Sequence, residues 1–527
     1  MRFFGFAASD LVEIAIALAI VVLSWRRIEP WVRALAARTG WSMALLALLP
    51  AALRLALTPR YPIPTPNVSD DFSYLLIADT LRHFRLANPV HPLDQFFETF
   101  FVLQQPAYAS IFPLGQGVVL VIGWAGVALS IGAMCALCYW MLRAWTTPGW
   151  ALVGGLLAVM EFGPLNQWMN SFWGGALAGC AGCVAFGALP RLLARRSAPM
   201  AALLGLGIGI SWLCRPYETI FLILSVALFL LLNWRSPMLW AVVVAIPGIA
   251  LSLAQNKQVT GSWTTLPYQM SQYQYGVPTT FTFQALPVPH RALTREQQLD
   301  YEQQSEVHDT ADGYWARWAG RLRFYRFFFL APLYVVIPLF LLRVREPRFA
   351  WVLATILLFN FGTNFYPYFY SHYIAALTCL FVLVSVIGLE RLSQWSEPGA
   401  RIVLILCAAH FLFWYGIHAS RDAELDAALS QYETWDAINQ GDPRGRIGIH
   451  DKLAGEPGQQ LVFVRYGPRH EFEEWVHNAA DIDHARIVWA RDLGVEENQK
   501  LLRYYPDRTA WLLEPDARPA RLVPYPR

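Results

Sequence analysis

Ser69-Asp70-Asp71-Phe72-Ser73-Tyr74 is a polar stretch with two adjacent carboxylates, and it lies between two long apolar segments. Serine is a favourable N-cap residue, so Ser69 predicts a helix that begins here and carries Asp70 and Asp71 in its first turn. The free amides and the dipole at a helix start favour negative charge there. The residues alone leave two interpretations open: an amphipathic helix on a membrane surface, or a site that needs paired carboxylates.

The composition is that of a membrane protein. Of 527 residues, 56% are hydrophobic and only 15% are charged, against roughly 25% charged in a typical soluble protein. The net charge is +3 and no long basic run occurs, so no nucleic-acid partner is predicted. The cysteines all fall in apolar segments, and their two C-x-x-C spacings predict helix-packing residues rather than a disulfide, metal or redox site: Cys135, Cys138, Cys180, Cys183, Cys214, Cys379 and Cys407.

A bilayer span needs about 20 mostly apolar residues. The hydrophobic segments predict about twelve transmembrane helices, at about 4–25, 41–57, 118–142, 150–165, 174–190, 199–214, 219–232, 238–255, 327–342, 349–363, 373–389 and 401–417. The first contains Asp10 and Glu13 and has no small-residue cleavage site, which predicts a retained or interfacial helix rather than a signal peptide. The topology of the N-terminus is left open.

Arginines occupy every second connection between these segments, and short basic loops are cytoplasmic. The residues are Arg26, Arg27, Arg33, Arg38, Arg143, Arg191, Arg195, Arg196, Arg235, Arg343, Arg345, Arg348, Arg391 and Arg401. The opposite connections then face outward. These are the first outer loop, 58–117, the segment 256–326 and the C-terminal tail.

The two later outward segments differ in character. Segment 256–326 is long and polar, which predicts a structured outer cap, with a flexible insert as the alternative. From Ser420 onward the composition is that of a soluble protein. A helix is predicted at 421–439, strands at 446–450, 461–465, 486–490 and 511–513, and helices at about 471–480 and 494–504. This alternation predicts a small α/β domain at 418–527, following a membrane domain at 1–417.

Further motifs follow the Asp70-Asp71 pair in order: Asn88-Pro89-Val90-His91-Pro92, Phe97-Glu98-Thr99, Ser171-Phe172-Trp173-Gly174-Gly175 and Arg215-Pro216-Tyr217-Glu218. Together they resemble the GT-C glycosyltransferases, especially the bacterial relatives of the protein O-mannosyltransferases and of the lipid A aminoarabinose transferase. The resemblance runs through most of the membrane part. Leu114 stands where the relatives carry a proline, which leaves the local backbone course open.

The resemblance implies that Asp70 is the catalytic base and that Asp71 orients groups around it. Transfer of a sugar from a polyprenyl phosphate needs a base for the acceptor hydroxyl and cations or donors for the departing phosphate. The candidates for the phosphate are Arg215, Arg85, His91 and His372, with Arg82 and His83 in the same loop as Arg85. Arg215 has a structural alternative as the partner of Glu218, and His372 as a hydrogen-bonded interfacial histidine.

Candidates for contacts with the substrate are polar side chains near these motifs: Tyr74, Glu98, Gln104, Gln105, Tyr108, Gln116, Tyr217 and Glu218. Asp70, Asp71 and His91 have the chemistry of a hard-cation site. However, the mannosyltransferase relatives are not regarded as strictly metal-dependent, so no metal or other cofactor is predicted.

The sequence therefore predicts an all-α polytopic membrane protein of the GT-C type with a small extracytoplasmic α/β domain. The resemblance implies an inverting glycosyltransferase in a bacterial inner membrane, with the C-terminal domain in the periplasm. It would use a polyprenyl-phosphate sugar donor among the membrane lipids, with a protein, lipid or glycan acceptor. The alternative is a non-enzymatic transporter or flippase of lipid-linked sugars, which would place its key charges near the bilayer midplane.

Overall fold

The computed structural model of the chain describes residues 6–195, 197–231, 238–309, 313–420 and 445–526. The chain divides into two compact units, each assembled from segments that are far apart in the sequence. Unit 1 consists of residues 1–65, 122–249 and 312–439, and unit 2 of residues 66–121, 250–311 and 440–527.

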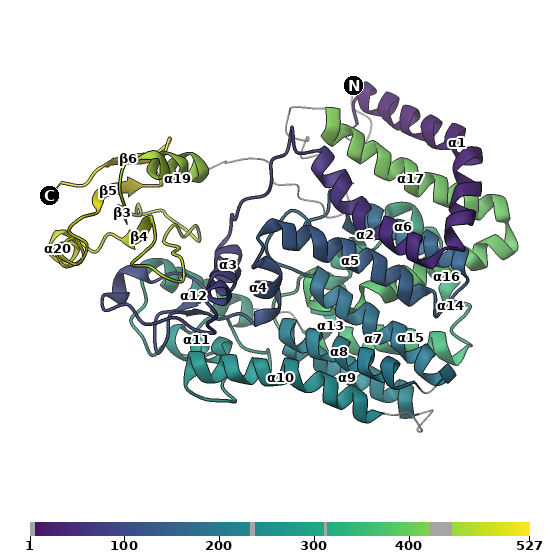
Figure 1. The fold of residues 1–527 in the computed structure, drawn as a ribbon, viewed down its shortest axis with the longest axis horizontal. Helices are drawn as coiled ribbons and strands as arrows, with labels where there is room; N and C mark the ends of the chain where they lie inside the picture. Colours follow the sequence, from purple (N-terminus) through teal and green to yellow (C-terminus); the bar gives the residue numbers. More distant parts are fainter. Residues whose placement is uncertain (1–5, 196, 232–237, 310–312, 421–444, 527) are drawn as a thin grey trace. The chain divides into compact units, whose positions relative to one another are not determined.

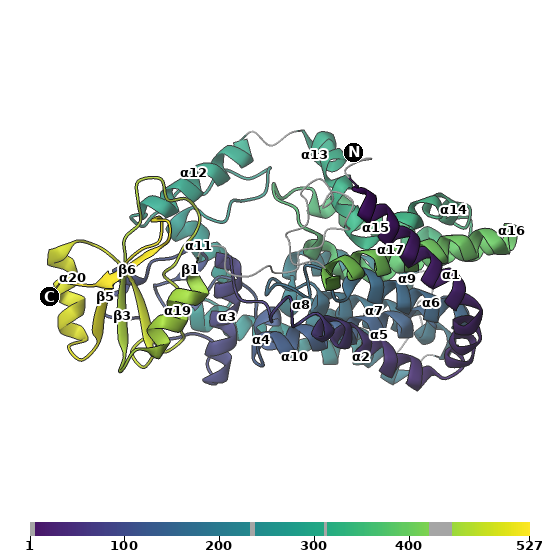
Figure 2. The same ribbon diagram turned by 90° about the horizontal axis from the view of Figure 1, so that it is seen from above.

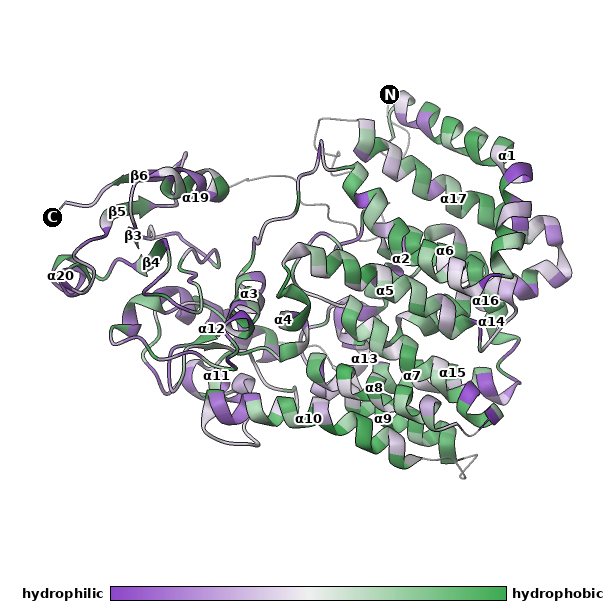
Figure 3. Ribbon diagram, viewed as in Figure 1, coloured by the Kyte–Doolittle hydropathy of each residue, from purple (hydrophilic) through white to green (hydrophobic). Residues whose placement is uncertain are grey.

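Unit 1 is a bundle of mainly apolar helices (Figures 1 and 3). They are α1 (Ala8–Ala36), α2 (Thr39–Ala56), α5 (Trp124–Leu142), α6 (Pro148–Phe162), α7 (Ala176–Arg195), α8 (Ala198–Cys214), α9 (Pro216–Leu231), α13 (Tyr314–Arg321), α14 (Ile337–Leu341), α15 (Pro347–Thr363), α16 (Thr378–Trp395) and α17 (Glu397–Ser420), with most of α10 (Met238–Thr260). Short 3-10 helices join them: η2 (Leu322–Phe328), η3 (Ala331–Val335) and η4 (Ser371–Leu377).

Within the described residues, seven helices are long and apolar enough to cross a membrane. They are α1, α2, α5, α7, most of α10, the continuous stretch Ser371–Trp395 and α17, and the shorter helices α6, α8 and α9 are also apolar. These results confirm the predicted fold class, a multi-pass helical membrane protein. The predicted span 327–342 is divided into η3 and α14. Pro332 and Pro338 lie in the first turns of these two helices, where a proline is tolerated because its missing amide would have no partner inside the helix.

Small residues bring the helices of unit 1 close together. A β-carbon at Gly132 would collide with the carbonyl of Ala47, and one at Gly182 with the carbonyl of Ala376. Close backbone approach at small residues is typical of helix packing in membranes. Cys180 is buried, and its thiol lies 3.5 Å from the carbonyl oxygen of Ser130. Cys135, Cys138 and Cys183 are likewise buried and free in α5 and α7.

The C-terminal part of unit 2 contains a four-stranded sheet in the order β4-β3-β5-β6. Strand β3 (Gln460–Val464) is parallel to both β4 (Ile487–Arg491) and β5 (Thr509–Glu514), and β6 (Arg521–Pro524) is antiparallel to β5. Helices α19 (Arg446–Gly455) and α20 (Val495–Tyr504) flank the strands on opposite sides (Figure 2). The predicted small α/β domain is confirmed.

Side chains alternate along β3, so each of its faces has a separate core. Val462 and Val464 pack with Leu453 of α19, whereas Leu461 and Phe463 pack with Leu501 of α20. A sheet that is covered on both faces explains the continuous apolar runs of its parallel strands.

Two local predictions for this domain are wrong. Residues 446–450 were expected to form a strand but begin α19, since Ile449 and Leu453, four residues apart, share one helix face and pack on the sheet. Residues 471–480 were expected to form a helix and are irregular. Here the carbonyls of Glu474 and Trp475 accept hydrogen bonds from Arg446 at 2.9 Å each. The predicted helix 421–439 lies outside the described residues.

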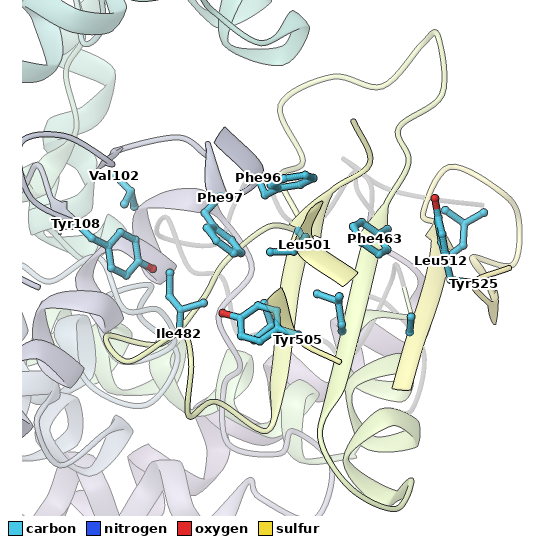
Figure 4. Packing of buried hydrophobic residues seen from close by; sticks show 14 of the residues in the cluster. Phe96, Phe97, Val102, Tyr108, Phe463, Ile482, Leu501, Tyr505, Leu512 and Tyr525 are labelled. Carbon is cyan, nitrogen blue, oxygen red and sulfur yellow. The ribbon is translucent and has the colours of Figure 1, made fainter. Parts of the chain in front are cut away.

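The rest of unit 2 is built from the two outward loops. The first loop forms α3 (Ser69–Arg82), η1 (Asp94–Phe97), β1 (Val102–Leu103), β2 (Ala109–Ser110) and α4 (Leu114–Leu120), and the later segment forms α11 (Pro267–Tyr275) and α12 (Arg295–Asp309). The later segment is thus structured, as predicted. Phe96, Phe97 and Tyr108 of the first loop pack in one core with Phe463 and Leu512 of the sheet (Figure 4). The conformation of the first loop therefore depends on the C-terminal sheet.

Candidate functional site

The two adjacent aspartates open α3, but they have different environments. Asp71 is 3% exposed, and its Oδ2 accepts hydrogen bonds from the backbone amides of Asn67 at 3.0 Å and Val68 at 3.4 Å. The cap residue is Val68, so the expected N-cap role of Ser69 is wrong and Ser69 is the first helical residue. Asp70 also lies in the first turn but is partly exposed. The pair thus consists of one buried residue that fixes the turn and one that borders solvent.

One face of α3 is fixed on the β1–β2 hairpin. The hydroxyl of Ser73 donates to the carbonyl of Phe101 at 2.7 Å and lies 2.7 Å from the hydroxyl of Ser110. Further along this face, a β-carbon at Gly117 of α4 would collide with Ile77. Glycine at 117 therefore allows α4 to pack directly on α3.

The opposite side of α3 contacts the C-terminal domain. Phe72 stacks on His477 with ring centroids 4.0 Å apart, and the guanidinium of Arg446 lies 4.2 Å from the Phe72 ring centroid. Asp79 accepts a hydrogen bond from the backbone amide of Ala480 at 2.7 Å. Burial holds the pKa of His477 well below its usual value, so this ring packs as a neutral group.

A buried polar cluster holds the first loop to the later outward segment. Glu98 is 5% exposed, pairs with Arg291, and accepts hydrogen bonds from Tyr275 at 3.0 Å and Gln297 at 3.3 Å. Burial raises the pKa of the Glu98 carboxyl, and Arg291 opposes this shift. Arg291 also pairs with Asp94 at 3.1 Å. Sequence reasoning missed Arg291, because its partners lie almost 200 residues away.

The other predicted substrate residues of the first loop also make contacts inside unit 2. Gln104 donates to the Phe97 carbonyl at 2.5 Å, Gln105 donates to Asp94 at 2.9 Å, Tyr108 donates to the Asn478 carbonyl at 3.1 Å, and Tyr74 stacks on Phe112 at 4.5 Å. Gln116 is buried in α4. A role in substrate binding stays a prediction for each of them.

The two predicted phosphate ligands of this loop have unlike surroundings. His91 is 6% exposed; its Nε2 lies 3.1 Å from the Tyr505 hydroxyl and its Nδ1 accepts from the Leu93 amide at 2.9 Å. Burial lowers the pKa of His91, and Asp483 opposes this shift. Arg85 is exposed just beyond the end of α3, where it borders a small hollow with Leu81 and Leu114.

The remaining candidates lie in unit 1, at the corner between α8 and α9. Arg215 is the residue between the two helices and has φ −148° and ψ 80°. Pro216 keeps the residue before it out of the helical conformation, so the corner falls at Arg215. Tyr217 donates to the carbonyl of Gly362 at 2.8 Å, which fixes the corner to α15, and Glu218 lies in the first turn of α9.

Aromatic rings connect Arg215 to His372. The Arg215 guanidinium lies 4.6 Å from the Tyr373 ring centroid, and His372 contacts the same ring edge-on at 4.8 Å. Trp173 meets the rings of Tyr370 at 5.4 Å and His372 at 5.7 Å. We call these five residues the Arg215 cluster. The structure thus brings together two residues that were predicted independently as phosphate ligands.

Trp173 belongs to the motif 171–175, and its place in the cluster is not predictable from the sequence. Two hydrogen bonds hold the residues just before Trp173: Arg54 donates to Asn170 at 2.7 Å, and Trp124 donates to the carbonyl of Met169 at 2.8 Å. Gly175 has φ +125°, and a β-carbon there would collide with Trp168. Among the described residues, the buried Nε1 of Trp173 has no hydrogen-bond partner. This loop therefore supplies a rigid, unsatisfied donor.

The described part of the chain contains no group of three or more His, Cys, Asp or Glu side chains that could hold a metal ion.

No protein-family model matches the sequence, and no curated protein matches it. Solved structures do resemble the fold. The match with ArnT from Cupriavidus metallidurans covers 91% of this chain and 93% of the ArnT chain, with a TM-score of 0.49 and 13% identity. The oligosaccharyltransferase of Archaeoglobus fulgidus, crystallised with zinc and sulfate, matches 90% of this chain and 67% of its own, with a TM-score of 0.43 and 11% identity. At this level of identity the likeness concerns the fold alone. Both TM-scores are below 0.5, so neither structure carries a functional argument for this chain.

Proposed function

We propose that the protein is a membrane glycosyltransferase that moves a sugar from a polyprenyl-phosphate donor to an acceptor at the outer face of a bacterial inner membrane. The acceptor hydroxyl attacks the anomeric carbon as the bond from that carbon to the phosphate oxygen breaks. The electron pair of that bond leaves with the phosphate, and the hydroxyl proton goes to a carboxylate. One displacement inverts the anomeric configuration, and it needs one base instead of two carboxylates.

The observation that carries the proposal is the difference in environment between Asp70 and Asp71. Asp71 is committed to the backbone at the start of α3, which fixes the position of its neighbour. Asp70 borders solvent in the same turn. A positioned carboxylate with access to an incoming hydroxyl is what general-base catalysis requires.

The Arg215 cluster supports the second requirement, stabilisation of the departing phosphate. Arg215 offers a charge-assisted donor beside Tyr373, and Trp173 offers a neutral donor that has no partner among the described residues. Charge-assisted hydrogen bonds to phosphate are among the stronger polar contacts in proteins. By contrast, we assign Glu98, Gln104 and Tyr108 to holding the first loop in place, because their partners lie within unit 2.

The competing function is transport of lipid-linked sugars. A transporter places its charged binding residues near the bilayer midplane, often at discontinuous helices. Here Arg215 follows the last residue of α8, and Asp70 lies outside every candidate span. The position of the charged candidates at helix ends and in a loop favours transfer over transport.

Replacement of Arg215 by alanine tests the phosphate role. Arg215→Ala is expected to weaken use of the lipid donor by about 10-fold to 150-fold, since a hydrogen bond to a charged group contributes about 1.5–3 kcal/mol. The measurement is the dependence of transfer rate on donor concentration. Arg191→Ala is the matched control, because Arg191 also lies over an aromatic ring, that of Trp140 at 4.0 Å. Equal losses in both variants would assign Arg215 to packing.

Cysteine accessibility tests the proposed orientation. Glu302 on α12 and Glu496 on α20 are exposed, so cysteines at these positions are expected to react with an impermeant reagent in intact spheroplasts. Arg345→Cys, in a connection predicted to be cytoplasmic, is expected to react only after lysis. Protection of positions 302 and 496 in intact spheroplasts would indicate the opposite orientation in the membrane.

A further inference from the structure

The C-terminal tip of α3, residues 82–85, carries the most exposed large hydrophobic side chain among the described residues. Its sequence is Arg82-His83-Phe84-Arg85, and the Phe84 side chain is 99% exposed. The backbone of Phe84 has φ +55°. A bulky residue rarely adopts positive φ, and glycine is the usual residue at such a helix end. The chain therefore keeps a phenylalanine in water where glycine would be less strained and more soluble.

The tip is an ordered helix end. The amide of Phe84 donates to the carbonyl of Leu81 at 2.9 Å, and the amide of Arg85 donates to the carbonyl of Thr80 at 3.1 Å. These bonds satisfy the last carbonyls of α3 in the manner of a helix C-cap. They hold the Phe84 ring away from the body of unit 2.

Arg82 connects the tip to residues that precede a candidate membrane span in the sequence. Its guanidinium donates to the carbonyls of Val121 at 2.8 Å and Leu120 at 3.3 Å. Val121 lies three residues before Trp124, which is the first residue of the candidate span α5. Because a chain extends at most about 3.5 Å per residue, the Arg82 contact lies within roughly 10 Å of the point where α5 begins.

The charges around Phe84 suit an anionic surface. Arg82, His83 and Arg85 are all exposed. Asp79 lies 3.9 Å from both Arg82 and His83, and Asp481 also faces His83. The guanidinium of Arg85 makes no hydrogen bond or ion pair with any other described residue. It is the cation of the tip that is available to an external phosphate.

We propose that the tip of α3 is a lipid contact, in which Phe84 inserts at the boundary of headgroups and acyl chains and Arg85 binds the phosphate of an anionic phospholipid. Basic residues beside an aromatic side chain are the composition of interfacial membrane anchors. The contact fixes the height of one end of α3 at the bilayer. Asp70 lies at the other end, about 18 Å away at 1.5 Å per residue. The proposal does not depend on the transferase reaction.

Photo-crosslinking in the full-length protein tests this contact. Phe84 is replaced by benzoylphenylalanine, which retains an aromatic ring, and the protein is reconstituted into vesicles of phosphatidylcholine with phosphatidylglycerol. Val495, which is 68% exposed on α20, is the matched control position. We expect severalfold more lipid adduct, measured by mass spectrometry, at position 84 than at 495. Equal labelling, or crosslinking of position 84 only to protein, would overturn the proposal.

The role of Arg85 is tested in the same vesicles. Arg85→Gln is expected to lower the adduct at position 84 about fivefold with phosphatidylglycerol, since one basic residue near an anionic surface contributes about 1 kcal/mol. It is expected to have little effect in pure phosphatidylcholine. An equal change in both lipids would contradict the phosphate contact.

Discussion

Asp70→Asn is expected to abolish transfer while leaving donor binding intact. The amide keeps the shape of the side chain but loses its proton affinity, and general-base catalysis contributes about a hundredfold to ten-thousandfold in rate. Transfer of radiolabelled sugar from a polyprenyl-phosphate donor, with donor binding measured in parallel, separates chemistry from affinity. Full transfer by this variant would reject Asp70 as the base.

Asp71→Asn is the matched control for that experiment. Asp71 accepts hydrogen bonds from the amides of Asn67 and Val68, and the oxygen of an asparagine amide still serves as an acceptor. We therefore expect much smaller losses than for Asp70→Asn. Asp71→Ala removes the acceptor and is expected to destabilise the start of α3 by about 0.5–2 kcal/mol.

The second large effect is expected at Arg491, the centre of a buried charge cluster in unit 2. Arg491 donates to Glu474 at 2.8 Å and pairs with Glu296 of α12, and all three side chains are at most 9% exposed. Arg491→Ala leaves two buried carboxylates without their cation, which typically costs about 3–5 kcal/mol. Hydrogen exchange of the amides in β3 and β4, measured in the full-length protein, reports this loss.

The pH dependence of the same variant gives an independent check. Burial raises the pKa of Glu474, and Arg491 opposes this shift, so the variant raises that pKa further. The folded variant then binds a proton more readily than the unfolded chain. The loss of unfolding free energy relative to the wild type is therefore expected to shrink as pH falls. Arg465→Ala removes a more exposed arginine, 48% exposed beside Asp492, and is expected to cost at most about 1 kcal/mol. Unchanged exchange in Arg491→Ala would contradict the structural role of the cluster.

The membrane part of the fold was predictable because the length of an apolar segment can be read directly from the local sequence. Within the described residues each predicted span corresponds to helical structure, and 327–342 is divided between η3 and α14, each of which has a proline in its first turn. The strands β3, β4 and β5 were also predictable, since parallel strands buried on both faces are continuous apolar runs. The short antiparallel strand β6, which ends at Pro524, was not predicted.

Local patterns failed where distant residues decide the structure. The run 446–450 resembles a strand, yet packing of Ile449 and Leu453 on the sheet makes it helical. The irregular course of 471–480 depends on Arg446, which takes up the carbonyls of Glu474 and Trp475. The pairs Glu98–Arg291 and Glu296–Arg491 join residues almost 200 positions apart. No sequence periodicity reports such contacts.

The candidate site was predictable only where local sequence determines it. The position of Asp70 and Asp71 in the first turn of a helix follows from local signals, although the cap itself is Val68. The juxtaposition of Arg215 and His372 around Tyr373 depends on how α8, α9 and η4 pack. The sequence therefore identified individual residues, and the packing of the helices groups them into a cluster.

The central claim, that the protein transfers sugars, is tested most directly in detergent, where no bilayer exists for transport. Purified wild-type protein is incubated with a panel of polyprenyl-phosphate sugars and an acceptor extract, and released polyprenyl phosphate is quantified. We predict acceptor-dependent release by the wild type and none by Asp70→Asn. Intact donor in detergent, together with movement of the lipid-linked sugar across liposome bilayers, would contradict the transferase and establish the transporter.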